Sequence, residues 1–200
     1  NYSMGQEPFA LKLVDINADA VLDVITVNAR SNDVSVRLGI GSGDFTEAVH
    51  YPAGNGLRSL AVADFNSDGR LDLVTANFSD DDISLLLGDG QGAFLSPTRF
   101  GDGPRAVVTV DFNDDGRPDI VVANFLGDNV VVLLGDGAGG FSQLASLPVG
   151  DGPVSVAVAD FDSDGRLDVA TVNAINGTAS IVLNQEQGGF GNATSVPVGA

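Results

Sequence analysis

The sequence predicts an all-β protein, a β-propeller of four-stranded antiparallel blades, with four blades in this chain. An acidic nine-residue motif recurs at steps of 49, 47 and 49 residues, beginning at Asp15, Asp64, Asp111 and Asp160. Each repeat is rich in Val, Ile and Leu and is divided by Gly, Asn, Asp and Pro, which is typical of short strands joined by turns. No segment shows the apolar spacing of a helix over a useful length.

The third repeat illustrates the expected order of elements. Strands are expected at 105–112 and 118–125, on either side of the acidic motif, so that the motif forms the tip of a β-hairpin. A third strand is expected at 129–134, followed by the Gly-rich turn GDGAGGF. A weaker fourth strand at 142–149 precedes the sequence GDGP, where the next repeat begins.

The inner strands are apolar at nearly every position, which indicates burial on both faces. Units of ~40–50 residues that are covered on both sides by like neighbours are typical of propeller blades. A β-solenoid is the competing architecture, but its coils are much shorter. We therefore expect residues 1–200 to form a single propeller or propeller segment, with repeats at approximately 4–52, 53–99, 100–148 and 149–197.

The acidic motif carries the strongest chemical signal in the sequence. Oxygen-bearing side chains occupy its positions 1, 3, 5 and 9, and Gly occupies position 6 in three of the four copies. Hard cations such as Ca²⁺ take six to eight oxygen ligands, and Gly permits the positive φ that a tight loop needs. Loops of Asp, Asn and Gly also cap hairpins without metal, but four copies with the same spacing favour a metal site.

The expected ligands are therefore the side chains at these four positions and, by analogy with other calcium loops, the backbone carbonyl at position 7. The first loop offers Asp15, Asn17, Asp19 and Asp23. The second offers Asp64, Asn66, Asp68, the Arg70 carbonyl and Asp72. The third offers Asp111, Asn113, Asp115, the Arg117 carbonyl and Asp119. The fourth offers Asp160, Asp162, Asp164, the Arg166 carbonyl and Asp168.

Two loops depart from the common pattern. The fourth has an additional carboxylate, Asp162, and is expected to bind the ion most tightly. The first has Ala20 where the others have Gly, and a Cβ at positive φ costs roughly 1 kcal/mol. We expect the first site to be the weakest, or its loop to take another shape.

The motif DFNxDGxxD, the following (V/A)AN, the turn LLGDGxGxF and the restart VGDGP resemble the FG-GAP family and its bacterial VCBS-type relatives. The same repeat builds the calcium-binding blades of the integrin α-subunit propeller. The resemblance covers all four units, from about Met4 to Pro197. It implies that each acidic loop joins the first and second strands of a blade and binds one Ca²⁺, up to four in the chain. It also implies an extracellular role in adhesion, protein binding or carbohydrate binding.

The overall composition excludes several classes of function. The formal net charge of −18 disfavours nucleic acid and anionic membrane surfaces as partners. The absence of Cys excludes disulfides and thiolate catalysis. No apolar stretch approaches the ~18 residues that span a bilayer. Crowded carboxylates repel one another without metal, so folding is expected to be coupled to the ion, and millimolar calcium favours a secreted or cell-surface location.

The leading functional hypothesis is a non-catalytic, extracellular calcium-binding scaffold that recognises a protein or a carbohydrate. One alternative is a self-assembling subunit of a surface layer or filament, and another is an accessory propeller of a secreted polysaccharide-degrading enzyme. Four blades leave a seven-bladed ring open, so the chain could be part of a longer protein, close as a tight ring, pair with a second copy or extend into a filament. Among the recurring residues, we expect one Asn per repeat to form a turn and one Phe per repeat to pack between blades.

Overall fold

The computed structural model describes residues 2–95, 98–100, 103–185 and 189–198. Residues 1, 96–97, 101–102, 186–188 and 199–200 of the predicted 1–200 unit lie outside this part of the chain. The described residues form strands, turns and loops, and they contain no helix with the length and hydropathy needed to cross a bilayer.

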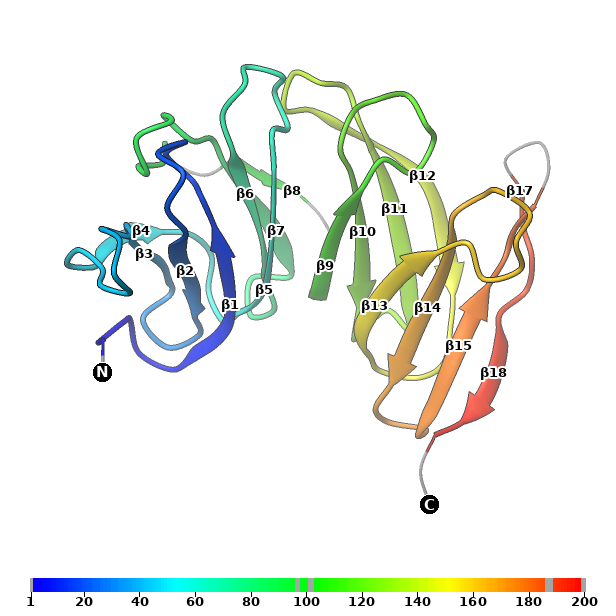
Figure 1. Ribbon diagram of the computed structural model, residues 1–200. Helices are drawn as coiled ribbons and strands as arrows, with labels where there is room; N and C mark the ends of the chain where they lie inside the picture. The colour runs from blue at the N-terminus through cyan, green and yellow to red at the C-terminus, as the bar shows by residue number, and fades with distance from the viewer. Residues whose placement is uncertain (1, 96–97, 101–102, 186–188, 199–200) are drawn as a thin grey trace.

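Four antiparallel sheets of four strands each follow one another along the chain, which confirms the all-β prediction (Figure 1). The first sheet comprises β1 (Pro8–Val14), β2 (Asp23–Asn28), β3 (Asp33–Arg37) and β4 (Val49–Pro52). The second comprises β5 (Leu57–Ala63), β6 (Asp72–Asn77), β7 (Asp82–Leu86) and β8 (Thr98–Phe100). The third comprises β9 (Pro104–Val110), β10 (Asp119–Asn124), β11 (Asn129–Gly135) and β12 (Phe141–Pro148). The fourth comprises β13 (Pro153–Ala159), β14 (Asp168–Asn173), β15 (Thr178–Val182) and β18 (Thr194–Pro197). A short pair, β16 (Asn184–Gln185) and β17 (Gly189–Phe190), lies in the last connection of the fourth sheet.

The strand ends differ from the predicted ones for a local reason. The strand expected at 105–112 ends at Val110, because Asp111 and Phe112 already belong to the acidic loop. The N–H of Phe112 donates to the Asp119 carboxylate at 2.8 Å rather than to a neighbouring strand. The second strand begins one residue later than expected, at Asp119, just as the second strands of the other sheets begin at the equivalent Asp23, Asp72 and Asp168.

The sheets stack side by side in an open arc (Figure 1), and the first strands of successive sheets contact one another. Within each sheet the strands lie in chain order, from the first strand on the inside of the arc to the last on the outside. Every residue of the second strands β6 and β10 is buried, because a neighbouring sheet covers each of their faces. Their continuous apolar sequences follow from this double burial.

Three hydrophobic clusters hold the arc together, one at each seam between consecutive sheets. At the first seam, Ile25 and Val27 of β2 pack with Leu60 and Leu73 of the second sheet. Equivalent clusters join the second sheet to the third and the third to the fourth. A full burial of each such side chain contributes ~1.5–3 kcal/mol, so the seams are the main source of stability.

A row of alternating rings and guanidinium groups crosses the first two seams at the end of the sheets opposite the acidic loops. We call it the Arg–Phe ladder, and its members in order are Phe9, Arg58, Phe78, Arg105 and Phe125. The guanidinium carbon of Arg58 lies 4.5 Å from the Phe9 ring centre and 5.8 Å from that of Phe78. Arg105 lies 5.7 Å from the Phe78 ring and 4.8 Å from the Phe125 ring. Such cation–π contacts add ~0.5–2 kcal/mol each to the packing.

Candidate metal centres

Each acidic motif forms the loop between the first and second strands of its sheet, as the resemblance implied. The loops span residues 15–22, 64–71, 111–118 and 160–167. All four project from the same rim of the arc, the upper rim in Figure 1. The four loops lie on one rim because each follows the end of a first strand, and all four first strands run in the same direction.

Side-chain oxygens gather inside each loop because they accept the loop's own backbone N–H groups. In the second loop, Asp64 accepts from the N–H of Asp68 at 3.1 Å and from that of Gly69 at 2.8 Å. Asp68 in turn accepts from the N–H of Arg70 at 2.9 Å. The other three loops repeat these bonds. The sequence therefore turns the carboxylates at positions 1 and 5 toward the interior of the loop.

Position 6 has a positive φ in every loop, at 83°, 82° and 88° for Gly69, Gly116 and Gly165. Ala20 adopts the same conformation, with φ of 67°, and its N–H donates to Asp15 at 2.8 Å. The first loop thus keeps the shape of the others, and the alternative expectation of a different shape is wrong. The expectation that its site is the weakest stays a prediction.

Position 4 is also left-handed in all four loops, which the sequence did not indicate. The φ angles are 59°, 57°, 58° and 63° for Ala18, Ser67, Asp114 and Ser163. None of these residues is Gly, and each costs roughly 1–2 kcal/mol in this conformation. Hydrogen bonds around the loop hold it there, so the loop stores strain of a kind that concentrates at functional sites.

The Asp at position 9 has a second role that sequence reasoning missed. Asp23, Asp72, Asp119 and Asp168 are all fully buried. In the third sheet, Asp119 accepts from the N–H of Phe112 at 2.8 Å and from that of Gly135 at 2.8 Å, which ties the loop to the end of β11. The other three make the same pair of bonds. We call this residue the latch aspartate of its loop.

Burial, mutual repulsion and hydrogen bonds shift the pKa of several of these carboxylates. Burial raises the pKa of Asp72 and Asp119, although their backbone hydrogen bonds oppose the rise. Desolvation, with repulsion from Asp164 and Asp168, raises the pKa of Asp162. The N–H of Gly165 lowers the pKa of Asp160. A bound cation would favour the charged form of every one of these groups.

Three carboxylates of the fourth loop lie at the spacing of a cation site. One carboxylate oxygen from each of Asp160, Asp162 and Asp168 lies within 4.8 Å of the other two. The carboxylate of Asp164, in the same loop, pairs with the Arg166 guanidinium. Three oxygen donors at this spacing could hold a metal ion.

The Arg at position 7 forms an ion pair through its side chain, in addition to offering the backbone carbonyl that the sequence analysis proposed as a ligand. Arg70 lies 3.4 Å from the Asp68 carboxylate and Arg117 lies 3.7 Å from that of Asp115. This ion pair was predictable from the sequence, because an acidic residue at position 5 is followed two residues later by a basic one at position 7. The first loop has Val21 in place of the Arg, so its carboxylates lack this partial neutralisation.

The recurring Asn closes each second strand with its side chain buried, at Asn28, Asn77, Asn124 and Asn173. In the second sheet its amide nitrogen donates to Ser84 at 2.7 Å and its amide oxygen accepts from Thr75 at 2.9 Å. The first and fourth sheets repeat this Thr–Asn–Ser network. In these three sheets the buried amide holds the following turn and has its hydrogen bonds within the protein, in agreement with the turn interpretation.

The third sheet lacks this network. Val122 and Val131 occupy the positions of the Thr and the Ser. Asn124 still donates to Asn129 at 2.8 Å, but its amide oxygen is buried and has no partner among the described residues.

Three of the four recurring Phe residues, Phe94, Phe141 and Phe190, pack at the seams as expected, whereas Phe45 meets Tyr2 at the N-terminal end of the arc, with ring centres 5.4 Å apart. Phe94 meets Tyr51 of the first sheet edge-on, with ring centres 5.4 Å apart. Phe141 meets Phe65 of the second sheet at 5.6 Å.

The family model of the FG-GAP-like repeat matches three overlapping stretches, residues 15–75, 64–122 and 111–171, each of which contains two acidic loops. The chain belongs to the FG-GAP-like repeat family. FG-GAP repeats often bind Ca²⁺, and the oxygen-only donor set of the fourth loop fits such an ion. No curated protein matches the sequence at a significant level.

Solved structures with the same fold include proteins from Agrocybe aegerita, Lactobacillus plantarum and Pseudomonas aeruginosa. A lectin of Agrocybe aegerita, described for its specific recognition of non-reducing terminal N-acetylglucosamine, matches with a TM-score of 0.59 and 21% identity over 94% of this chain and 52% of that chain. A protein from Lactobacillus plantarum matches with a TM-score of 0.71 and 18% identity, covering 98% and 57%. The periplasmic gluconolactonase PpgL of Pseudomonas aeruginosa matches with a TM-score of 0.69 and 18% identity, covering 96% and 54%.

These identities show the fold alone. The FG-GAP chain spans about half the length of these solved structures. It is a propeller segment of four blades.

Proposed function

We propose that this FG-GAP chain is a calcium-stabilised, non-catalytic propeller segment that acts outside the cell in the recognition of a carbohydrate or a protein. The observation that carries the proposal is the fourfold acidic loop, with its inward-turned oxygens, its strained position 4 and its buried latch aspartate. Loops of this kind gain rigidity from an ion, because the cation offsets the repulsion between carboxylates. Millimolar calcium outside cells suits sites of this exposed type.

The distant likeness to the Agrocybe aegerita lectin supports the carbohydrate arm of the proposal. The sparse supply of catalytic side chains supports a non-catalytic role, since the chain has one His and one Lys. That His, His50, lies 2.9 Å from the Ser35 hydroxyl on a sheet face, and no other sheet repeats it.

Calcium dependence is tested by thermal unfolding in three buffers: one with millimolar calcium, one with magnesium alone and one with a chelator. The proposal expects a higher midpoint in calcium than in magnesium or chelator, because four sites that bind only the folded chain stabilise it by mass action. Equal midpoints in all three conditions would contradict it. Screening of the calcium-loaded chain on a glycan array and against extracellular proteins then tests recognition.

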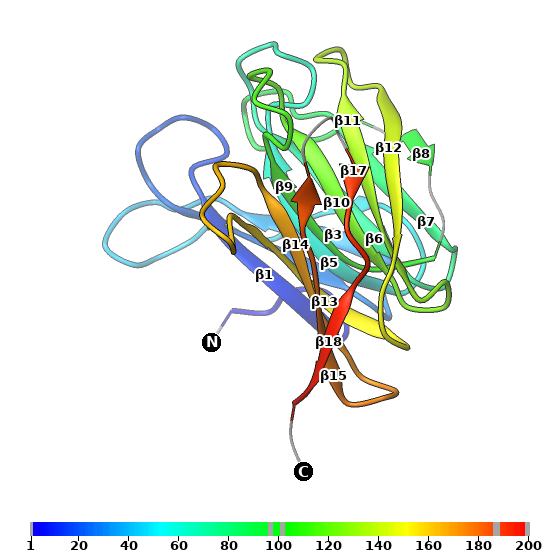
Figure 2. The same cartoon turned by 90° about the vertical axis from the view of Figure 1, so that its right-hand side faces the viewer.

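A second candidate, self-assembly into a larger ring or filament, is favoured by the two ends of the arc. Leu11 of β1 is 56% exposed, whereas its counterpart Leu60 is 4% exposed because the preceding sheet covers it. At the other end, which faces the viewer in Figure 2, Val172 of β14 is 46% exposed, whereas its counterpart Ala123 is fully buried. Each end therefore presents the apolar surface that an adjoining blade covers elsewhere in the arc.

A second copy of the chain would cover both ends, as would further blades of the same polypeptide. Light scattering of the isolated chain in calcium separates these cases. A mass of twice 20.4 kDa or more supports self-assembly, and a concentration-independent 20.4 kDa particle refutes it.

A further inference from the structure

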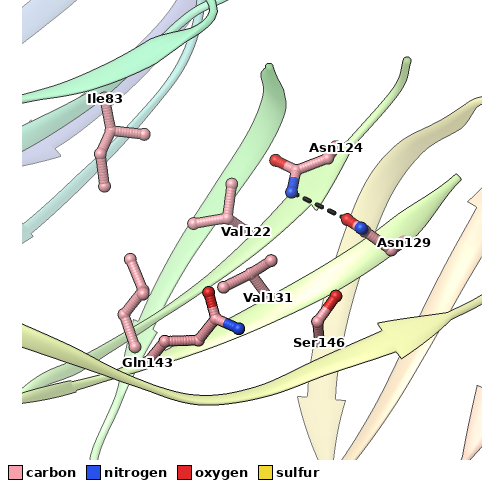
Figure 3. A pocket seen from close by; sticks show the side chains of 8 residues that line it. Ile83, Val122, Asn124, Asn129, Val131, Gln143 and Ser146 are labelled. Carbon is pink, nitrogen blue, oxygen red and sulfur yellow. Dashed lines mark hydrogen bonds between the residues drawn. The ribbon is translucent and has the colours of Figure 1, made fainter. Parts of the chain in front are cut away.

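A pocket of about 210 Å³ lies at the seam between the second and third sheets (Figure 3). Ile83 of β7 forms one wall, and Val122 of β10 and Val131 of β11 form the other. Gln143 and Ser146 of β12, both exposed, line its mouth. The volume far exceeds the ~30 Å³ of one water molecule and falls below the ~300–1,000 Å³ of sites for drug-sized ligands.

A buried hydrogen-bond acceptor without a partner lines this pocket. Asn124 is 3% exposed, and its amide oxygen has no hydrogen bond among the described residues. Figure 3 shows the amide nitrogen directed to Asn129 and the oxygen directed away from it, on the side of Val122. An unpaired buried acceptor costs ~1–3 kcal/mol, so the site gains from any molecule that supplies a donor.

The other three sheets show what is missing. In each of them a Thr hydroxyl donates to the equivalent Asn oxygen, at 3.1 Å from Thr26, 2.9 Å from Thr75 and 2.9 Å from Thr171. In the third sheet Val122 stands in place of the Thr, and Val131 stands in place of the Ser. Both hydroxyl groups next to Asn124 are therefore missing, and its amide oxygen has no donor within the part of the chain that the structure describes.

The lining defines the chemistry of a ligand. Among the described residues no titratable side chain lines the pocket, so a charged ligand would lose its hydration without compensation. Ile83, Val122 and Val131 offer apolar contact, Asn124 offers an acceptor at depth, and Gln143 and Ser146 offer donors and acceptors at the mouth. This combination suits a compact neutral molecule with hydroxyl groups and an apolar flank.

We infer that this pocket, the third-sheet pocket, binds a neutral hydroxylated small molecule, such as the terminal sugar of a glycan, through a hydroxyl donated to the Asn124 oxygen. The inference deepens the carbohydrate arm of the proposed function and rests on it. It assigns recognition to one seam, the one at which the Thr–Asn–Ser network is absent.

The test restores the network that the other sheets contain. Wild-type chain in calcium is titrated with neutral monosaccharides (N-acetylglucosamine, galactose and fucose) by ligand-observed NMR, beside Val122→Thr and the double variant Val122→Thr/Val131→Ser. Thr at position 122 supplies the donor from within the protein, so at least tenfold weaker binding of the sugar is expected in both variants. The same variants are expected to unfold at higher urea concentration, which shows that they fold.

Val49→Thr makes the same chemical change at a position of β4 that is 51% exposed and is expected to leave binding unchanged. Wild-type chain that binds none of the three sugars, or Val122→Thr that binds them as well as wild type, overturns the inference.

The glycan array separates this failure from failure of the proposed function. If wild type and Val122→Thr recognise the same glycans equally, recognition stands and this pocket is not its site. If the chain recognises neither glycan nor protein in calcium, the proposed function itself fails.

Discussion

The latch aspartate allows the structural role of a carboxylate to be separated from its role as a metal ligand. Asp119 is fully buried and accepts two backbone N–H groups, from Phe112 and Gly135. In Asp119→Ala both N–H groups stay buried without an acceptor, at ~1–3 kcal/mol each, so the latch term amounts to ~2–6 kcal/mol. The Asp115 carboxylate, in the same loop, has exposed partners among the described residues: the Arg117 N–H and side chain and the Asn113 amide.

Both Asp119→Ala and Asp115→Ala remove a proposed ligand of the third site and are expected to abolish calcium binding there. The difference in unfolding free energy between the two variants therefore measures the contribution of the latch hydrogen bonds. Urea unfolding in saturating calcium is expected to show Asp119→Ala less stable than Asp115→Ala by ~2–6 kcal/mol, since exposed contacts contribute at most ~1 kcal/mol. Equal unfolding free energies for the two variants would refute the reasoning, because the buried N–H groups would then have found other acceptors at no cost.

Three further predictions concern packing and backbone strain, each measured by urea unfolding in calcium. Leu60→Ala is expected to cost ~2–5 kcal/mol, because Leu60 fills the first seam, whereas Leu11→Ala at the exposed end of the arc costs under ~1 kcal/mol in the monomer; equal costs would mean that another surface covers Leu11. Ala20→Gly is expected to stabilise the chain by roughly 1 kcal/mol and Gly69→Ala to destabilise it by a similar amount, since both positions have positive φ; the opposite signs would contradict the strain argument. Arg58→Ala is expected to cost ~1–4 kcal/mol, from two cation–π contacts of ~0.5–2 kcal/mol each, and Arg58→Lys to recover part of it; an unchanged midpoint for Arg58→Ala would show that the ladder contributes nothing.

Periodicity made most of the fold predictable from the sequence. The all-apolar stretches around Ile120 and Leu73 predicted strands buried on both faces, and both are fully buried. The Gly at position 6 predicted a positive φ, which Gly69 and its counterparts adopt. These features depend on residue type and local spacing alone, so one sequence suffices to find them.

Features that depend on distant partners were not predictable in the same way. The left-handed conformation of Ser67 and Asp114 follows from the closure of the whole loop, and their side chains give no sign of it. The latch role of Asp119 depends on the N–H of Gly135, which lies at the far end of the next strand. The third-sheet pocket depends on Val122 and Val131 facing Asn124, and only the pairing of strands brings these positions together.

The Arg–Phe ladder ends at Phe125, where the fourth sheet has Val154 and Ala174 in place of its next members. Salinity consequently acts unevenly along the arc. Exposed ion pairs such as Arg117 with Asp115 weaken in brine, whereas partly buried contacts are screened far less. Among the described residues the last seam has no cation–π contact; an apolar cluster and one hydrogen bond, from the Gly152 N–H to Asp128 at 2.8 Å, hold it. Salting-out anions strengthen apolar contact, so the fourth blade is the one whose attachment responds most to the kind of salt in its surroundings.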